Sequence, residues 1–526
     1  MRWRWPTHVL VLAVLITACT SSAPPGGTTP GVSQAPGASL VLVPRTLTAV
    51  VAVEPTTLDG LYESAGPVLS TITQNMAETL ARLDPATSQV KPWLATGWKQ
   101  VDATTWQITI RAGVKFHDNS TMTADDVVAS INYSLQKGST VQSAKLPLWT
   151  AAQAVGASTV QITTSRSNPL LPFQLQFASV APASVIAKGK DFMATNVTGT
   201  GPFKLVEWTK GQRLTLTRFD GYWGTKPQFQ DVTIVWRKEA SVRADMVRTG
   251  EAQIAQSMSA SDLRGLPKMA SVASLDVYKL IPNTIGQTKG SVMTDQRVRL
   301  AVNYAIDRTA LRDKIYGGQA TLVKGNIVSS PAVLGYVADL QDYPYDPQKA
   351  KSLIAEAGAA GKPVSFVCSG GRFLNDGEAC QFIAAQLNQV GLTVTMTNPA
   401  AAVWLDTFRN GATGLDRPDL LFATWTNDTF DIASRSAATN WKSRGAGGGG
   451  ETIADPTLDR MIDAALAESD LSKRRSLTEE IVKYVRDHVY YIPLLAPNYI
   501  WGLAENVEYE PLANDNLFLS SIRYKN

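Results

Sequence analysis

The residues best placed to do chemistry form a short polar segment after a buried strand. Residues 420–423, LLFA, are an apolar run of strand length, and 424–428, TWTND, follow directly. Loops at the carboxyl ends of parallel strands are where α/β domains usually bind ligands. An indole ring there can stack on a ligand side chain or a cation. The alternative is that the tryptophan packs in the core and the aspartate caps a turn. The candidate ligand contacts are Trp425 and Asp428 and, more weakly, Asn427 and Trp441.

Catalytic interpretations find little support in the residue pattern. No GxSxG, HExxH or Walker motif occurs. His117 lies in a predicted turn, where a structural role is favoured, and His488 lies near a predicted helix end. Residues 445–450, GAGGGG, fit GxGxxG formally, but no strand precedes them and no capped helix follows. Asp125 and Asp126 fit a helix start better than an acid–base pair. The sequence therefore predicts a protein that is not an enzyme.

The elements of the first half show clear local patterns. Residues 106–110 alternate apolar and polar side chains, which predicts a strand. Thr123 and Asp126 have the spacing of a capping box and predict a helix that continues to Leu135. A helix is also expected from about Ser70 to Leu83. Residues 136–195 are rich in Ser, Ala and Pro and indicate irregular structure.

The second half alternates helices with strands. Asp346-Pro347 opens one predicted helix and Asp455-Pro456 another, each with a cap residue followed by a first-turn proline. This βαβ rhythm predicts a mostly parallel sheet. The further elements expected are strands at 364–367, 392–396 and 490–495 and helices at 378–390 and 475–488.

Bulk composition limits the class of protein. The chain has 526 residues, 44% hydrophobic content and 18% charged residues, enough for two or three domains. The formal net charge is +4, and it falls further if a segment containing Arg2 and Arg4 is removed. This charge balance argues against a nucleic-acid partner, and no basic tract interleaved with aromatics appears.

The N-terminus has the features of an export signal. Arg2 and Arg4 precede a short apolar core, and Ile16-Thr17-Ala18-Cys19 resembles a lipobox. We therefore expect a signal peptide at 1–18 and lipidation of Cys19, which would anchor the chain to the outer face of the cell membrane. An ordinary cleaved signal is the alternative. Residues 19–39 are rich in Ser, Thr, Pro, Gly and Ala and predict a flexible tether.

Two further cysteines, Cys368 and Cys380, end a predicted strand and begin a predicted helix. An exported protein permits a disulfide between them, which we favour over two buried thiols. No metal site is expected, because no histidine lies nearby and CxxC spacing is absent.

Several segments together resemble one known family, the family 5 substrate-binding proteins of ABC importers. They lie in the family's order and cover about residues 90–510. The segments are RAGVKFHDNSTMTADDVVASINYSL at 111–135, GTGPFKLVEW at 199–208, FDGYWGTKPQFQDV at 219–232, VRLAVNYAIDRTAL at 298–311 and YDPQKAKSLIAEAG at 345–358.

The resemblance implies an α/β, two-lobed periplasmic-binding-protein-like fold of class II. The expected first lobe spans 40–285, with an extra subdomain at about 77–195. The expected second lobe spans 286–495, and a tail at 496–526 returns to the first.

The resemblance also implies a function and a binding site. A small solute, most simply a di- or oligopeptide, would be enclosed between the lobes and delivered to an ABC permease and its ATPase. By the family's W-x-x-D pattern, Asp428 would pair with the ligand's α-ammonium group. No cofactor is expected, and the protein is expected to be a monomer. Nickel complexes, opines, oligosaccharides and a receptor or adhesin role remain alternatives. From the first lobe the expected contacts are Tyr62, Glu63 and Ser64, within Asp59–Gly66.

Overall fold

The structure is a computed structural model. It describes residues 46–64, 67–84, 89–400, 403–404, 407–408, 417–427, 429–443 and 452–525. All of them belong to one compact unit, Pro44–Asn526. The predicted signal peptide, the tether and Cys19 lie outside the described residues, as does Asp428. No helix among the described residues is long and apolar enough to cross a membrane.

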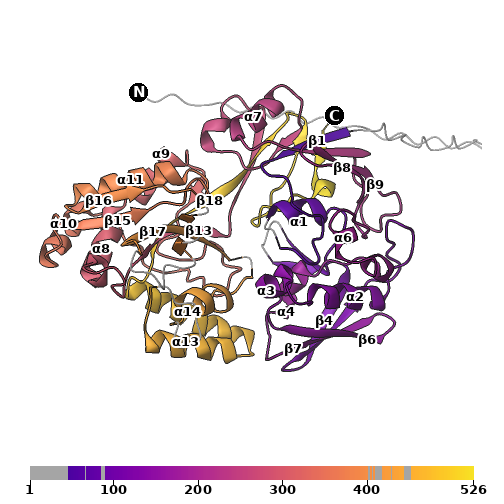
Figure 1. The fold of residues 1–526 in the computed structure, drawn as a ribbon, viewed down its shortest axis with the longest axis horizontal. Helices are drawn as coiled ribbons and strands as arrows, with labels where there is room; N and C mark the ends of the chain where they lie inside the picture. The colour runs from indigo at the N-terminus through magenta and orange to yellow at the C-terminus, as the bar shows by residue number, and fades with distance from the viewer. Residues whose placement is uncertain are drawn as a thin grey trace, which may run out of the picture. The chain divides into compact units, whose positions relative to one another are not determined.

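A mixed 12-stranded sheet forms the framework (Figure 1). Its main path runs β16-β15-β17-β13-β18-β11-β1-β10-β9-β8, and β12 and β14 pair with β18. In path order the strands are β16 (Thr393–Thr397), β15 (Pro363–Val367), β17 (Leu420–Thr426), β13 (Asp276–Pro282), β18 (Ile492–Leu503), β11 (Ile254–Ala255), β1 (Thr46–Val51), β10 (Asp231–Trp236), β9 (Arg213–Arg218) and β8 (Phe203–Thr209), with β12 (Lys268–Ala273) and β14 (Ala320–Thr321) beside β18.

Strand β18 connects the two ends of this sheet. Its first residues pair with β13, and residues 498–503 pair with β12. Strand β13 begins at Asp276, before the expected lobe boundary at 286, and pairs with β17 and β18. The division at 286 stays a prediction. The expected tail contacts the first lobe, since Asn75 Nδ2 donates to Leu517 O at 2.7 Å and Leu519 N donates to Asn75 Oδ1 at 2.8 Å.

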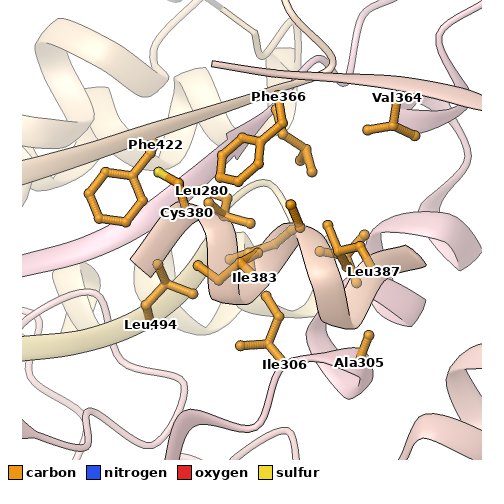
Figure 2. Packing of buried hydrophobic residues seen from close by; sticks show 14 of the residues in the cluster. Leu280, Ala305, Ile306, Val364, Phe366, Cys380, Ile383, Leu387, Phe422 and Leu494 are labelled. Atoms are coloured by element: carbon orange, nitrogen blue, oxygen red, sulfur yellow. The ribbon is translucent and has the colours of Figure 1, made fainter. Parts of the chain in front are cut away.

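The expected parallel sheet of the second half forms only in part. Strand β15 is parallel to β16 and β17, whereas β13 is antiparallel to β17. Helix α11 (Asp376–Gln389) covers these strands. Figure 2 shows Cys380, Ile383 and Leu387 along α11 among Phe366, Phe422 and other core side chains. A disulfide joins Cys368 to Cys380.

A separate four-stranded sheet forms the core of the expected subdomain. Its order is β4-β5-β7-β6, with β4 (Ala95–Asp102), β5 (Thr105–Ile110), β7 (Thr159–Thr164) and β6 (Trp149–Gly156). The predicted strand at 106–110 and the capping box at Thr123 and Asp126 are confirmed, and the box starts α2 (Ala124–Ser134). The prediction of irregular structure at 136–195 is wrong at the β6–β7 hairpin, where Val160 and Ile162 alternate with Gln161.

The remaining elements surround these sheets. The helices are α1 (Pro67–Thr73), α3 (Thr140–Lys145), α4 (Leu171–Gln174), α5 (Ala183–Ile186), α6 (Lys190–Met193), α7 (Ala240–Arg248), α8 (Gln296–Ala305), α9 (Arg308–Ile315), α10 (Pro347–Glu356), α13 (Pro456–Ala467) and α14 (Leu471–Asp487). The short helices are η1 (Leu175–Phe177), η2 (Ala260–Leu263), η3 (Val292–Thr294), η4 (Ala433–Trp441) and η6 (Leu519–Ser521), and the small strands are β2 (Ala81–Leu83), β3 (Val90–Pro92), β19 (Val507–Glu508) and β20 (Arg523–Tyr524).

The helix predicted from Ser70 to Leu83 is wrong in its second half. Helix α1 ends at Thr73, and β2 occupies Ala81–Leu83. The backbone between them bonds to a distant turn instead of continuing the helix. Gly201 N donates to Met76 O at 2.8 Å, and Phe203 N donates to Asn75 O at 3.2 Å. Tertiary hydrogen bonds therefore override the local helical preference.

His117 fixes the same turn from its other side. Its Nε2 donates to Gly201 O at 3.0 Å, and its Nδ1 accepts from Gly199 N at 3.3 Å. These two partners define the neutral tautomer with the proton on Nε2. Burial lowers the pKa of His117 to about 4. His117, which belongs to the family-like segment 111–135, is therefore a structural residue.

The buried carboxylate of Glu78 connects this turn to β2 and to the FDGYWG segment. Its side chain is fully buried. Its Oε1 accepts from Arg82 Nη2 at 3.0 Å, Trp93 Nε1 at 2.7 Å and Tyr222 OH at 2.8 Å. Its Oε2 accepts from Thr200 Oγ1 at 2.9 Å and Trp223 Nε1 at 2.8 Å. Such a set of donors offsets the cost of burying the charge.

Replacing Gly201 by alanine should destabilise the protein. A Cβ at Gly201 would lie 2.4 Å from Asn75 O, a backbone atom that cannot rotate away. We expect a loss of about 1–3 kcal/mol in the free energy of unfolding, measured by denaturant titration. Gly97→Ala is the matched control because its Cβ would meet open space. Equal stability of the two variants would refute the close-packing argument.

The stability of the fold should also depend on pH through His117. Its folded pKa is about 4, below the unfolded value of about 6.5, so the unfolded chain binds more protons between these values. This contribution is complete above about pH 6.5 and is lost as the pH falls toward about 4. Between about pH 7.5 and about pH 4, the free energy of unfolding of wild type should fall by about 3 kcal/mol more than that of His117→Gln, measured by denaturant titration. An equal fall in the free energy of unfolding of the two proteins would contradict the lowered pKa of His117.

Candidate functional site

A cavity of about 430 Å³ lies where residues 60–64 and 69–74, the subdomain, β13, β18 and the C-terminal tail meet. Its size is within the range of small-ligand sites. The lining combines acidic, basic and amide side chains. The polar and charged lining residues are Glu63, Ser64, Ser70, Thr73, Gln74, Thr79, Arg82, Lys145, Gln176, Ser179, Asp276, Arg372, Tyr499, Asn514 and Asn516.

Of the three predicted first-lobe contacts, Glu63 and Ser64 line the cavity. The Glu63 carboxylate accepts from Thr140 Oγ1 at 3.1 Å and lies 3.6 Å from Lys190 Nζ. Tyr62 is not among the lining residues. It is buried, and its hydroxyl donates to Lys137 O at 2.7 Å. The carboxylate of Glu63 therefore lies at the cavity. Tyr62 does not line it, and its hydroxyl instead bonds this part of the chain to Lys137.

Asp276 contributes an acidic group from the start of β13. Its Oδ2 accepts a hydrogen bond from Tyr499 OH at 2.8 Å. Burial and the nearby Asp276 raise the pKa of Tyr499, so its hydroxyl stays a donor. Asp276 is paired with Thr426 in the β13–β17 register. The carboxyl end of β17 thus lies beside the cavity wall.

Arg82 contributes a fixed cation from β2. Its guanidinium lies close to two aromatic rings, with Cζ 4.0 Å from the Trp93 ring centroid and 4.2 Å from that of Phe518. Burial lowers the pKa of Arg82, and the neighbouring Glu78 carboxylate opposes that shift. An arginine pKa has a wide margin above neutrality, so the side chain stays charged.

Two further cations line the cavity from other elements. Lys145 ends α3, and its Nζ lies 4.9 Å from the centroid of the Phe177 ring, which also lines the cavity. Arg372 follows β15 and is exposed. Its Cζ lies 5.4 Å from the Trp404 ring centroid. The cavity can therefore offer positive groups on more than one wall.

Two of the predicted second-lobe contacts, Asn427 and Trp441, lie in the core. Asn427 is buried, and its Nδ2 donates to Leu275 O at 3.2 Å. Trp441 is fully buried in a hydrophobic cluster. Trp425 lies in β17, with its backbone paired to Val277. Asn427 and Trp441 do not line the cavity, and the roles of Trp425 and Asp428 stay predictions.

Sequence reasoning missed Arg82, Asp276, Arg372, Tyr499 and the tail residues. For Arg372 a usable indication existed, because it follows the carboxyl end of a parallel strand, the position that the sequence analysis had assigned to residues 424–428. Arg82 was hidden by the wrong helix prediction. No local pattern marks the tail residues Asn514 and Asn516, which reach the cavity only through long-range packing on α1.

Within the described ranges, no group of three or more His, Cys, Asp or Glu side chains is arranged to hold a metal ion. The cavity's own groups are suited to hydrogen bonding and charge pairing with an organic ligand.

Two of the curated relatives illustrate the similarity of this chain to known proteins. A dipeptide-binding protein of Escherichia coli (strain K12) is 32% identical over 304 residues, 52% of this chain and 56% of that protein. A di/tripeptide-binding protein 2 of Pseudomonas aeruginosa (strain UCBPP-PA14) is 25% identical over 500 residues, 88% of this chain and 92% of that protein. The chain thus aligns with little more than half of the first relative and nearly all of the second.

A solved structure shows the same fold. The ABC transporter-associated periplasmic binding protein DppA from Helicobacter pylori, in complex with the peptide STSA, has a TM-score of 0.71 and 22% identity. The match covers 92% of this chain and 98% of that one. The predicted class II periplasmic-binding fold is therefore confirmed.

Residues 89–445, more than half of the chain, match the family model described as "Bacterial extracellular solute-binding proteins, family 5 Middle". The family predicted from the sequence motifs is confirmed by this match. The chain belongs to family 5 of the bacterial extracellular solute-binding proteins, and it is a binding protein rather than an enzyme.

Proposed function

We propose that this protein is the substrate-binding component of an ABC importer and that its ligand is a di- or oligopeptide. The observation that carries the proposal is the cavity, whose lining presents acidic and basic groups together. A peptide has an ammonium group at one end, a carboxylate at the other and amides between. Acids, bases and side-chain amides are the complementary groups.

The positions of the charges support a zwitterionic ligand. Asp276 lies on the β13 wall, whereas Arg82 and Lys145 lie on the wall formed by β2 and the subdomain. The predicted ammonium anchor Asp428 follows β17, whose last residue is paired with Asp276. Names of the two curated relatives, which refer to dipeptides and tripeptides, agree with this ligand class.

Delivery to a permease would follow from ligand-dependent closure. Because the lining comes from widely separated segments, a ligand that contacts all of them favours the state in which they are close together. A permease that recognises this state would receive loaded protein in preference to empty protein.

We further propose that Cys19 carries a lipid anchor. The lipobox-like segment before it and the polar tether at 19–39 support this. Acyl chains on Cys19 would hold the binding unit near a membrane permease, and a tether with almost no large apolar residue would let it move freely.

The peptide proposal predicts binding by the chain that lacks residues 1–39. Di- and tripeptides at about 100-fold above their Kd should stabilise it by about 2.7 kcal/mol, seen as a rise in Tm. Mass spectrometry of ligand co-purified with this form should identify peptides. Absence of a Tm shift with a broad peptide set, together with a co-purified ligand of another class, would overturn the proposal.

The same binding measurement on an Asp428 variant tests whether Asp428 pairs with the peptide's α-ammonium group. Asp428→Ala should weaken peptide binding about 10-fold or more, because it removes a charge-assisted hydrogen bond. N-acetylated peptides should bind wild type and variant alike. If the variant binds free peptides as tightly as wild type, Asp428 is not the anchor.

The lipid proposal predicts incorporation of fatty acid at Cys19. Metabolic labelling with palmitate should label the wild-type chain and leave Cys19→Ala unlabelled, because the thiol is the acceptor of the diacylglyceryl group. Labelling to the same extent in both would show that the anchor is absent or lies elsewhere.

A further inference from the structure

Asp515, in the C-terminal tail, is a buried carboxyl group with too few hydrogen-bond donors for a charge. The residue is 6% exposed. Its Oδ2 accepts from Gln256 Nε2 at 3.0 Å, whereas its Oδ1 is buried without a hydrogen-bond partner among the residues that the structure describes. A buried carboxylate with one side-chain donor is costly, because little offsets its loss of hydration. By contrast, each oxygen of the buried Glu78 carboxylate accepts at least two hydrogen bonds.

Gln256, which directly follows β11, has the complementary deficiency. Its Oε1 is also buried without a partner in the described part of the chain. Its Nε2 donates to Asp515 O at 3.2 Å as well as to Oδ2, and these two bonds fix the orientation of the amide. A neutral carboxylic acid and an amide can pair through two hydrogen bonds, one N–H···O and one O–H···O. A proton on Asp515 Oδ1 would therefore satisfy both unpartnered oxygens.

Arg243 of α7 is the cation that faces Asp515, and it does not supply the missing donor. Its guanidinium donates to four backbone carbonyls instead, those of Arg237, Lys238, Gln256 and Ser257. Burial raises the pKa of the Asp515 carboxyl well above its ordinary value. The hydrogen bond from Gln256 opposes this shift, the nearby Asp276 adds to it, and Arg243 opposes it.

The acidic and phenolic groups around Asp515 make a negative charge there still less favourable. Asp276 of β13 faces it with a second carboxyl group. Tyr499 OH donates to Asp276 Oδ2 at 2.8 Å and Tyr509 OH donates to Asn516 O at 3.0 Å, so neither hydroxyl is given to Asp515. Burial raises the pKa of both tyrosines, which therefore stay neutral.

We infer that Asp515 carries a proton at neutral pH and that its acid–amide pair with Gln256 positions the tail at the cavity. Asn514 and Asn516, the residues on either side of Asp515, line the cavity. Asp515 itself has φ of 61°, a left-handed conformation that Asp and Asn adopt more readily than most residues. The positioning role rests on the proposed function, because it assumes that the ligand occupies this cavity, whereas the proton on Asp515 does not.

The test variant for the proton is Asp515→Asn, whose amide supplies an N–H donor, tolerates the same φ and cannot ionise. In wild type the unfolded carboxyl loses its proton near pH 4 and the folded one keeps it, so stability falls as the pH rises toward the folded pKa. Between about pH 5 and about pH 8, the folding equilibrium constant of wild type should fall at least about 10-fold more than that of the variant. Denaturant titrations measure both, and the contribution of His117 cancels because both proteins contain it.

The matched control is Asp419→Asn, the same change at an acid that is also 6% exposed. Asp419 Oδ2 accepts from Ser365 N and Ser365 Oγ, each at 2.8 Å, and Oδ1 accepts from Ser291 Oγ. Loss of the charge there weakens these hydrogen bonds. At about pH 7 the control should have a lower Tm than wild type, whereas Asp515→Asn should have a Tm equal to or above that of wild type.

Infrared spectroscopy at about pH 7 detects the proton directly. Exposed carboxyl groups are ionised at this pH, so the carbonyl stretch of a neutral carboxylic acid comes only from buried groups. The wild-type spectrum should contain a component of this band that Asp515→Asn lacks. If the substitution leaves the band unchanged, Asp515 is ionised in the folded protein and the inference is overturned.

The positioning role is tested by calorimetry with Ala-Ala-Ala on the form lacking residues 1–39. Asp515→Asn should keep the wild-type Kd, because it preserves both hydrogen bonds to Gln256. Gln256→Leu, which removes the amide and keeps a side chain of similar size, should raise Kd about 10-fold. Measurement well below the Tm of each variant separates weaker binding from unfolding.

Each outcome decides one part of the inference. The same pH dependence in wild type and Asp515→Asn, or a lower Tm for this variant at about pH 7, would mean that Asp515 is a stabilised carboxylate, and the inference fails. A wild-type Kd in Gln256→Leu would overturn the positioning role. If wild type binds no peptide, the proposed function fails and the positioning role fails with it, but the stability and infrared measurements still decide the proton because they need no ligand.

Discussion

The buried carboxylate of Glu78 is the constraint on which the first half of the structure depends. A charge out of contact with water is tolerated only when it is well paired and hydrogen-bonded. Here the partners come from segments far apart in the chain, so each must reach the same point for the charge to be satisfied. The donors are Arg82, Trp93, Thr200, Tyr222 and Trp223.

This arrangement gives the motifs that identify the family a structural role, and none of their residues is among those that line the cavity. Thr200 of the GTGPF turn donates a hydrogen bond to Glu78, and the glycines of this turn pack against residues 75–77. His117 of the FHD turn holds the same glycines by two hydrogen bonds. The motifs therefore build a rigid support, and Arg82 is the one member of the network that also lines the cavity.

Patterns that depend on neighbouring residues were predicted well. The capping box at Thr123 and Asp126 needs only a spacing of three residues, and it forms as expected. The helix predicted to reach Leu83 failed because Asn75 and Met76 give their carbonyls to a turn more than a hundred residues away. The prediction of a mostly parallel sheet failed at β13. This strand pairs antiparallel with β17, and no local sequence pattern indicates that pairing. Asn427 was chosen because it follows a strand, but its side chain bonds to backbone in the core instead.

The sequence by itself determined the family, the α/β class and the exclusion of catalysis, because these depend on motifs and periodicities read over short windows. It also placed Glu63 and Ser64 at the cavity through the family resemblance. Only the tertiary structure decided which charges share one cavity. Arg82, Asp276 and Arg372 lie on three different strands or loops, and long-range strand pairing and the returning tail bring them together. The chemistry offered to the ligand is therefore a property of packing between distant segments, which no local pattern encodes.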